Sequence, residues 1–128
     1  MAREISVDSV RMPRRTVTYR SQSSVYYGFA EFGIDQPLPH AAGIFMLAEE
    51  TVGPDRWRIL LVGETADFAT GMQHNGAVRE ARRRGASRIL LHFSPLGGQR
   101  RLDAAQDLSM AIRSPLVSWP TEPLHRFG

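Results

Sequence analysis

The chain has 128 residues, of which 42% are hydrophobic and 23% are charged, as expected for one soluble globular domain. No apolar run approaches the roughly 18 residues that a transmembrane helix needs, so no membrane partner is expected. The polar segment 1–15 shows no signal-peptide pattern. The chain has no cysteine, which excludes disulfides and thiolate metal sites. We therefore expect a cytoplasmic protein.

The distribution of charge is more informative than its total. All 16 basic residues are arginine, so a net charge of only +3 gives an isoelectric point near 10.2, which by itself is weak support for nucleic-acid binding. Residues 79–101, however, hold seven arginines against Glu80 alone, a local net charge of +6. Guanidinium groups bind phosphate through paired hydrogen bonds. A GC-rich genome would also explain the missing lysine, but not the clustering.

The first half of the chain has the pattern of β-structure. Residues 1–15 are predicted to be a flexible arm, and residues 16–31 a β-hairpin, because β-branched and aromatic residues flank a polar turn. An apolar run at 43–48 predicts a buried strand. A glycine-proline turn within 49–55 connects it to a paired strand at 57–62.

Two helical segments are predicted to follow. Thr65 is a candidate N-cap for a helix that begins near Ala66. Helical periodicity continues over residues 77–84, with arginines on one face and small apolar residues on another. Gly85 is a natural C-cap that ends this segment.

The last part of the chain predicts one more strand and one more helix. Residues 87–94 contain an apolar run that indicates a strand. A helix at 99–112 follows and is stopped by a serine-proline pair, leaving residues 118–128 as a C-terminal tail. The apolar stripe of this helix is formed by Leu102, Ala105, Leu108 and Ile112.

The order of these elements predicts a small α/β (α+β) domain over residues 16–117. Its core, residues 43–117, is expected to be a mainly antiparallel three-stranded central sheet with flanking helices in the order β-β-α-α-β-α. The hairpin at 16–31 precedes this core. No internal repeat divides the chain, so one domain is expected.

Two short strings beside the predicted strands resemble a known family. Gly43-Ile44-Phe45 and Leu61-Val62-Gly63-Glu64-Thr65 are similar to the paired motifs that give the GIY-YIG nucleases their name. Segments 80–89 and 107–116 resemble the patterns E-A-x-x-x-G-A-T-H and D-L-x-x-x-x-x-P-P-L-N of a bacterial subgroup with an N-terminal hairpin. The resemblance covers roughly residues 16–117 and implies descent from metal-dependent endonucleases.

The residues that the resemblance would make catalytic are missing. The family uses two tyrosines, an arginine, a metal-binding glutamate and an asparagine to cleave phosphodiesters. The corresponding positions are Phe45, Leu61, Gly71, Ala105 and Val117. None carries the required polar atom, so we expect no catalytic residue, no metal and no cofactor. Magnesium or manganese would be needed only by an active nuclease, for which a shifted last helix would offer Asp103 or Asp107.

Two other groups of residues are candidate sites. Glu64, Asp67 and His74 could form a residual polar cluster that binds a metal or a phosphate, although a solvated histidine is the simpler interpretation. The predicted nucleic-acid contacts are Arg79, Arg82, Arg83, Arg88, Arg100 and Arg101. A plain solvated helix face would explain the first three equally well.

The sequence therefore predicts a catalytically degenerate GIY-YIG-like domain that binds nucleic acid, DNA in preference to RNA, through an arginine-rich surface without cleaving it. One alternative is a protein-interaction or regulatory module that binds an unidentified protein. Another is a metal-dependent endonuclease with an active site rebuilt around Glu64, Asp67 and His74.

Overall fold

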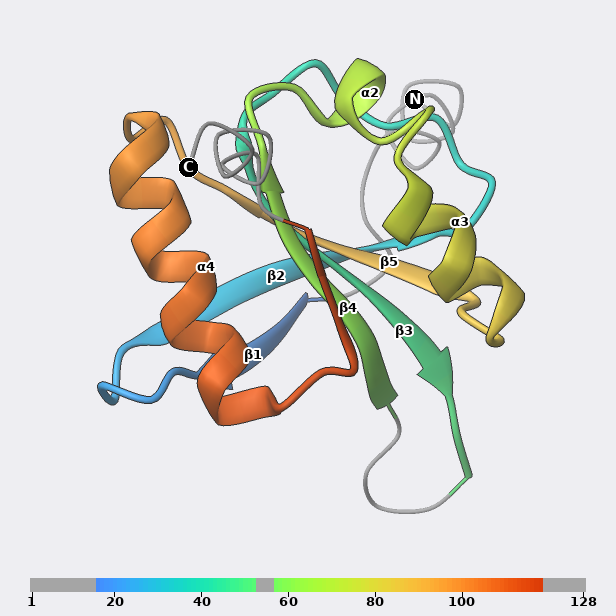
Figure 1. Cartoon of the computed structure of the whole chain (residues 1–128), viewed down its shortest axis with the longest axis horizontal. Helices are drawn as coiled ribbons and strands as arrows, with labels where there is room; N and C mark the ends of the chain where they lie inside the picture. Colours follow the sequence, from blue (N-terminus) through green and yellow to red (C-terminus); the bar gives the residue numbers. More distant parts are fainter. Residues whose placement is uncertain (1–15, 53–56, 119–128) are drawn as a thin grey trace, which may run out of the picture.

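The computed structural model describes residues 16–52 and 57–118 and shows an α+β fold (Figure 1). The predicted arm at 1–15 and nearly all of the predicted tail at 118–128 lie outside the described residues. The described part forms a six-stranded mixed sheet, in the order β1-β2-β5-β3-β4-β6, and three helices. The elements are β1 (Thr16–Arg20), β2 (Tyr26–Gly33), β3 (Gly43–Glu50), β4 (Trp57–Thr65), α2 (Phe68–Gly71), α3 (Gly76–Arg83), β5 (Arg88–Phe93), α4 (Gly98–Ile112) and β6 (Leu116–Ser118).

The sheet is larger than the predicted three-stranded one, which is not confirmed. The predicted hairpin forms, but it is part of the same sheet because β2 pairs antiparallel with β5, placing Ala30 opposite Leu91. A short strand that the sequence did not predict, β6, pairs parallel with β4, with Leu116 opposite Leu61. Such pairings depend on residues distant in the chain, so local pattern does not reveal them.

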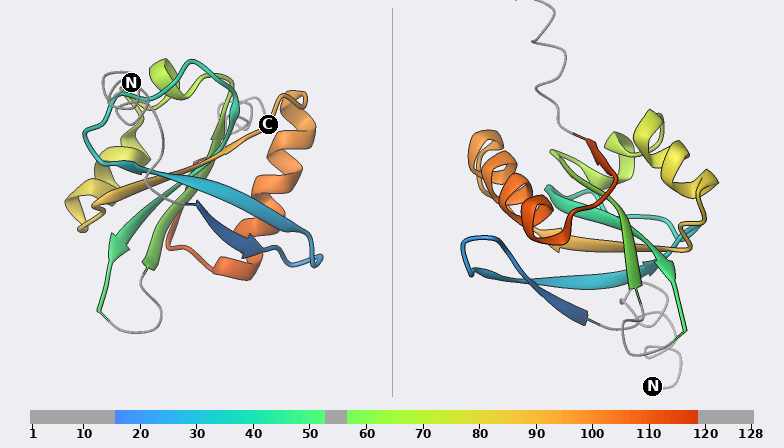
Figure 2. Two further views of the ribbon diagram at one scale, coloured as in Figure 1. Left: turned by 180° about the vertical axis from the view of Figure 1, so that it is seen from behind. Right: turned by 60° about the horizontal axis from the view of Figure 1, so that its bottom comes forward.

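The core lies on both faces of the central strands. In β3 the side chains alternate, so Phe45 and Leu47 belong to one buried cluster and Ile44 and Met46 to the other. Helices α2 and α3 cover the first cluster and α4 covers the second, which separates the helices into two layers (Figure 2). Because β3 is buried on both faces, its sequence is a continuous apolar run rather than an alternating one.

Two glycines of the central strands are required by close packing. A Cβ atom on Gly43 would lie 2.0 Å from the carbonyl oxygen of His92 and 2.6 Å from the ring of Phe68. A Cβ atom on Gly63 would lie 2.4 Å from the ring of Phe45, its partner across the strand pair. The two glycine-containing strings therefore have a packing reason in this fold that is independent of any catalytic role.

The helix ends agree only in part with the sequence prediction. Helix α2 begins after Asp67 rather than after Thr65, whose hydroxyl oxygen instead accepts a hydrogen bond of 3.2 Å from the Asp67 amide. Helix α3 has a strong N-cap, because the Asn75 side chain accepts hydrogen bonds from the amides of the first turn. Gly85 follows α3 with a φ of +113°, as expected for the predicted C-cap.

Helix α4 uses the predicted apolar stripe. Leu102, Ala105 and Leu108 are buried, and Ile112 packs partly against the same cluster. The helix ends at Ile112 and is followed by Arg113, which adopts the left-handed conformation with a φ of +60°. Within residues 16–52 and 57–118, no helix is long and apolar enough to cross a membrane.

The hairpin turn is attached to α4 through Asp107. The carboxylate of Asp107 accepts hydrogen bonds from the Ser23 amide, at 3.0 Å, and from the Ser23 hydroxyl. The hydrogen bond from the Ser23 hydroxyl is the main reason that the pKa of Asp107 lies below its ordinary value of 3.8.

This lowered pKa predicts a contribution to stability that depends on pH. The unfolded chain takes up the proton first, so the stabilisation is complete above the unfolded pKa and is lost as the pH falls through the folded pKa. We expect the unfolding free energy of the wild type to fall more steeply between about pH 5 and pH 2 than that of Asp107→Asn. Urea unfolding at several pH values measures both slopes, and equal slopes would contradict the assignment.

Candidate nucleic-acid interface

The exposed side of α3 carries a continuous group of arginines. We call Arg79, Arg82, Arg83 and Arg84 the α3 arginine face; all four are exposed. The opposite side of the helix packs Val78 and Ala81 into the core, which fixes the direction of the arginines. Arg84 was counted in the basic segment but was not among the predicted contacts.

The arginine face is only partly neutralised by carboxylates. Arg82 pairs with Asp35 at 2.8 Å, and Glu80 pairs with both Arg83 and Arg84. Hydrogen bonds from Arg84 and then from Arg83 lower the pKa of Glu80 below its ordinary value of 4.5. Four arginines against two carboxylates leave a net charge of +2 on this surface.

Among the described residues, Arg79 forms no ion pair, so its guanidinium is available to a ligand. Arg83 is also accessible, because 76% of its side chain is exposed and an exposed ion pair with a shared carboxylate contributes little stability. Both guanidinium groups can therefore bind an anion without breaking a buried interaction. Guanidinium groups bind phosphate and carboxylate anions through paired hydrogen bonds.

Two arginines of the predicted basic segment are paired with buried carboxylates and do not belong to the candidate interface. Arg88 donates to the buried Glu31 at 2.9 Å, and Arg101 donates to the buried Glu64 at 2.7 Å. Arg101 is itself buried and also donates to the carbonyl of Leu96. These two arginines therefore hold strands and helices together rather than contacting a ligand.

Arg100 is exposed but lies on the other side of the sheet, near the start of α4, whereas the α3 arginine face lies on the side of α2 and α3 (Figure 2). Sequence proximity placed these residues in one cluster, but β5 runs between the two helices and takes the chain from one layer to the other. The seven arginines consequently do not form one patch. The α3 arginine face remains as the candidate interface.

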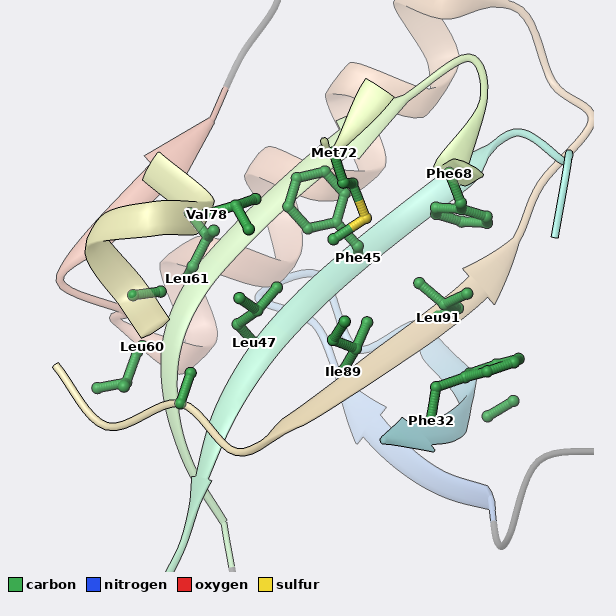
Figure 3. Close-up of a cluster of buried hydrophobic side chains, with 13 residues drawn as sticks. Phe32, Phe45, Leu47, Leu60, Leu61, Phe68, Met72, Val78, Ile89 and Leu91 are labelled. Atoms are coloured by element: carbon green, nitrogen blue, oxygen red, sulfur yellow. The ribbon is translucent and has the colours of Figure 1, made fainter. Parts of the chain in front are cut away.

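The five positions that the resemblance would make catalytic do not converge on one site. Phe45 and Leu61 are fully buried in the cluster under α2 and α3 (Figure 3), whereas Ala105 belongs to α4 and is fully buried against the opposite face of the sheet. Gly71 ends α2, where a Cβ atom would lie 2.1 Å from the Thr65 hydroxyl oxygen. Val117 is exposed on β6.

The predicted polar cluster is also dispersed. Glu64 pairs with Arg101 on the α4 side, while Asp67 accepts hydrogen bonds near the start of α2 and His74 is exposed. Within residues 16–52 and 57–118, no group of three histidine, aspartate or glutamate side chains could hold a metal ion. The metal ligands considered for a shifted helix are engaged as well, because Asp103 pairs with Gln99 and Asp107 with the hairpin turn.

A contact between His40 and Asp67 was not predicted. The Nδ1 atom of His40 lies 3.0 Å from the Asp67 carboxylate, which also accepts a hydrogen bond of 2.7 Å from the Thr70 hydroxyl. The hydrogen bonds from Thr70 and then from His40 lower the pKa of Asp67. The two partners are 27 residues apart in the chain, so no local motif could have revealed them.

Comparisons with known protein families, with curated proteins and with solved structures find no match to this chain. Among the predicted contacts, the described structure retains Arg79, Arg82 and Arg83 on one surface and adds Arg84.

Proposed function

We propose that this protein is a GIY-YIG-like domain that binds the phosphate backbone of nucleic acid, DNA in preference to RNA, and does not cleave it. The α3 arginine face is the proposed contact surface. The observation that carries the proposal is the exposed group of three arginines on α3 and a fourth, Arg84, at its C-cap, with Arg79 free of any ion pair in the described residues. Backbone contacts of this kind give affinity without reading the sequence.

Two further properties support the part of the proposal that concerns cleavage. The positions expected to be catalytic carry only apolar side chains or none, and they are divided between the two faces of the sheet. Cleavage of this family's type needs a carboxylate that ligates a divalent cation near the attacking water. Ala105 cannot supply such a ligand. The proposal also places the protein in the cytoplasm, consistent with a chain that lacks cysteine.

The proposed surface is tested by replacing the two accessible arginines together. In the double variant Arg79→Ala/Arg83→Ala, we expect weaker binding to labelled DNA. The slope of log affinity against log salt concentration should become less steep by about two units, because each phosphate contact contributes about 0.9 to its magnitude. Arg82 is kept, since its hydrogen bonds to Asp35 and to the carbonyl of Ile34 connect α3 to the loop between β2 and β3.

A matched control distinguishes the effect of losing this surface from the effect of losing the same net charge elsewhere. The double variant Arg20→Ala/Arg58→Ala removes the same charge from exposed positions on β1 and β4. It should retain the salt slope of the wild type. Equal slopes for all three proteins would show that the α3 arginine face is not the contact surface. A protein-interaction module would instead show no salt-sensitive DNA binding in any of them.

A further inference from the structure

A pocket opens next to the α3 arginine face, between α2, α3 and the loop that connects β2 to β3. It encloses about 270 Å³. Phe68, Met72, Val78 and Ile89, which line it, belong to the cluster drawn in Figure 3. The partly buried side chains of the loop, Ile34 and Leu38, complete the apolar wall.

The rim of this pocket is polar and joins the arginine face. Arg82 lines the pocket and donates through Nη1 to the carbonyl of Ile34, at 3.0 Å, and through Nη2 to Asp35, at 2.8 Å. The Asp35 carboxylate is therefore compensated at the rim. A chain of phosphates that follows the α3 arginines would pass directly beside the pocket opening.

Two side-chain amides at the pocket, those of Gln36 and Gln73, are suited to hydrogen bonding with a planar polar group of a ligand. The Oε1 atom of Gln36 accepts a hydrogen bond of 2.9 Å from the Gly33 amide, which fixes the orientation of this side chain. Within the described residues, the amide nitrogen of Gln36 and the side chain of Gln73 have no hydrogen-bond partner. Apolar walls with a small number of polar groups, some of them fixed in orientation as Gln36 is, are the usual composition of a specific binding pocket.

We infer that this pocket takes one unpaired nucleobase, so that the preferred ligand is single-stranded rather than duplex nucleic acid. The inference rests on the proposed function, because the α3 arginines must hold the adjacent phosphates. A volume of about 270 Å³ lies just below the range of roughly 300–1,000 Å³ for small-molecule pockets, which suits a single flat ring system. A base inside an intact duplex is stacked and paired and cannot enter.

The test is to fill the pocket without touching an arginine. Ala69 lines the pocket from α2, and Ala69→Phe places a ring inside it. Affinity for a fluorescein-labelled single-stranded oligonucleotide, measured by anisotropy, should fall about tenfold, as when one stacked base is lost. Affinity for the duplex of the same sequence should not change. Ala111→Phe adds the same ring at an exposed position on α4 and should change neither affinity.

A second variant distinguishes a blocked pocket from a misfolded protein. Gln73 is exposed at the pocket, so Gln73→Phe blocks the opening without entering the core and should give the same selective loss. If both blocking variants bind single strands as tightly as the wild type, or lose affinity for single strands and duplex equally, the pocket does not bind a base. If arginine-dependent binding persists in that case, only this inference fails. If the wild type binds neither substrate, the proposed function fails as well.

Discussion

Replacing Arg101 by methionine is expected to lower the free energy of unfolding by about 3–5 kcal/mol. The Nε atom of Arg101 donates to Glu64 at 2.7 Å, and only 1% of the Glu64 side chain is exposed. Removing the guanidinium leaves this carboxylate buried without a partner, and an uncompensated buried charge is costly. Urea unfolding of the two proteins measures the difference.

Two comparisons identify the cause of this loss. Arg100→Met changes the neighbouring arginine, which is exposed and forms no ion pair within the described residues, and should alter stability by less than about 0.5 kcal/mol. The double variant Glu64→Leu/Arg101→Met removes both charges and should recover most of the lost stability. If Arg101→Met were as stable as the wild type but bound DNA more weakly, Arg101 would belong to the interface instead.

Replacing Gly43 by alanine is expected to cost about 3 kcal/mol, at the upper end of what overpacking usually costs. The new methyl group would lie 2.0 Å from the backbone carbonyl oxygen of His92, on the neighbouring strand β5. A backbone atom in a central sheet cannot move away as a flexible side chain can, so β3 and β5 would have to separate. The result would be weaker pairing at the centre of the sheet.

The control for this substitution is another strand glycine. A Cβ atom on Gly28 in β2 would meet nothing within 4 Å, so Gly28→Ala should change stability by less than about 0.5 kcal/mol. Thermal or urea unfolding of the two variants gives the comparison. Equal stability of Gly43→Ala and the wild type would mean that β3 and β5 are not packed closely enough at Gly43 to exclude a methyl group.

The local elements could be predicted because their patterns are strong, whereas the sheet could not. The continuous apolar run of β3 and the stripe of α4 each satisfy one clear periodicity. The attachment of β2 to β5 and the parallel pairing of β6 depend on contacts between distant segments. Helix α2 was placed too early because both Thr65 and Asp67 are residues that cap helices.

The candidate interface could be predicted only in part because sequence proximity is not surface proximity. Arg101 occupies the same stripe of α4 as Ala105 and Leu108, at spacings of four and seven residues. Glu64 is two residues from Val62 on β4 and therefore lies on the same face, which is buried on the α4 side. A charged residue in an apolar stripe predicts a buried pair, and this signal could have excluded Arg101 from the interface.

The most direct test of the central claim is a binding and cleavage assay with wild-type protein on labelled single- and double-stranded DNA. It is run across a salt series, with and without magnesium or manganese. We predict that the protein binds DNA, that this binding weakens steeply with salt, and that the DNA stays intact in the presence of either metal. Metal-dependent cleavage, or the absence of any salt-sensitive binding, would contradict it.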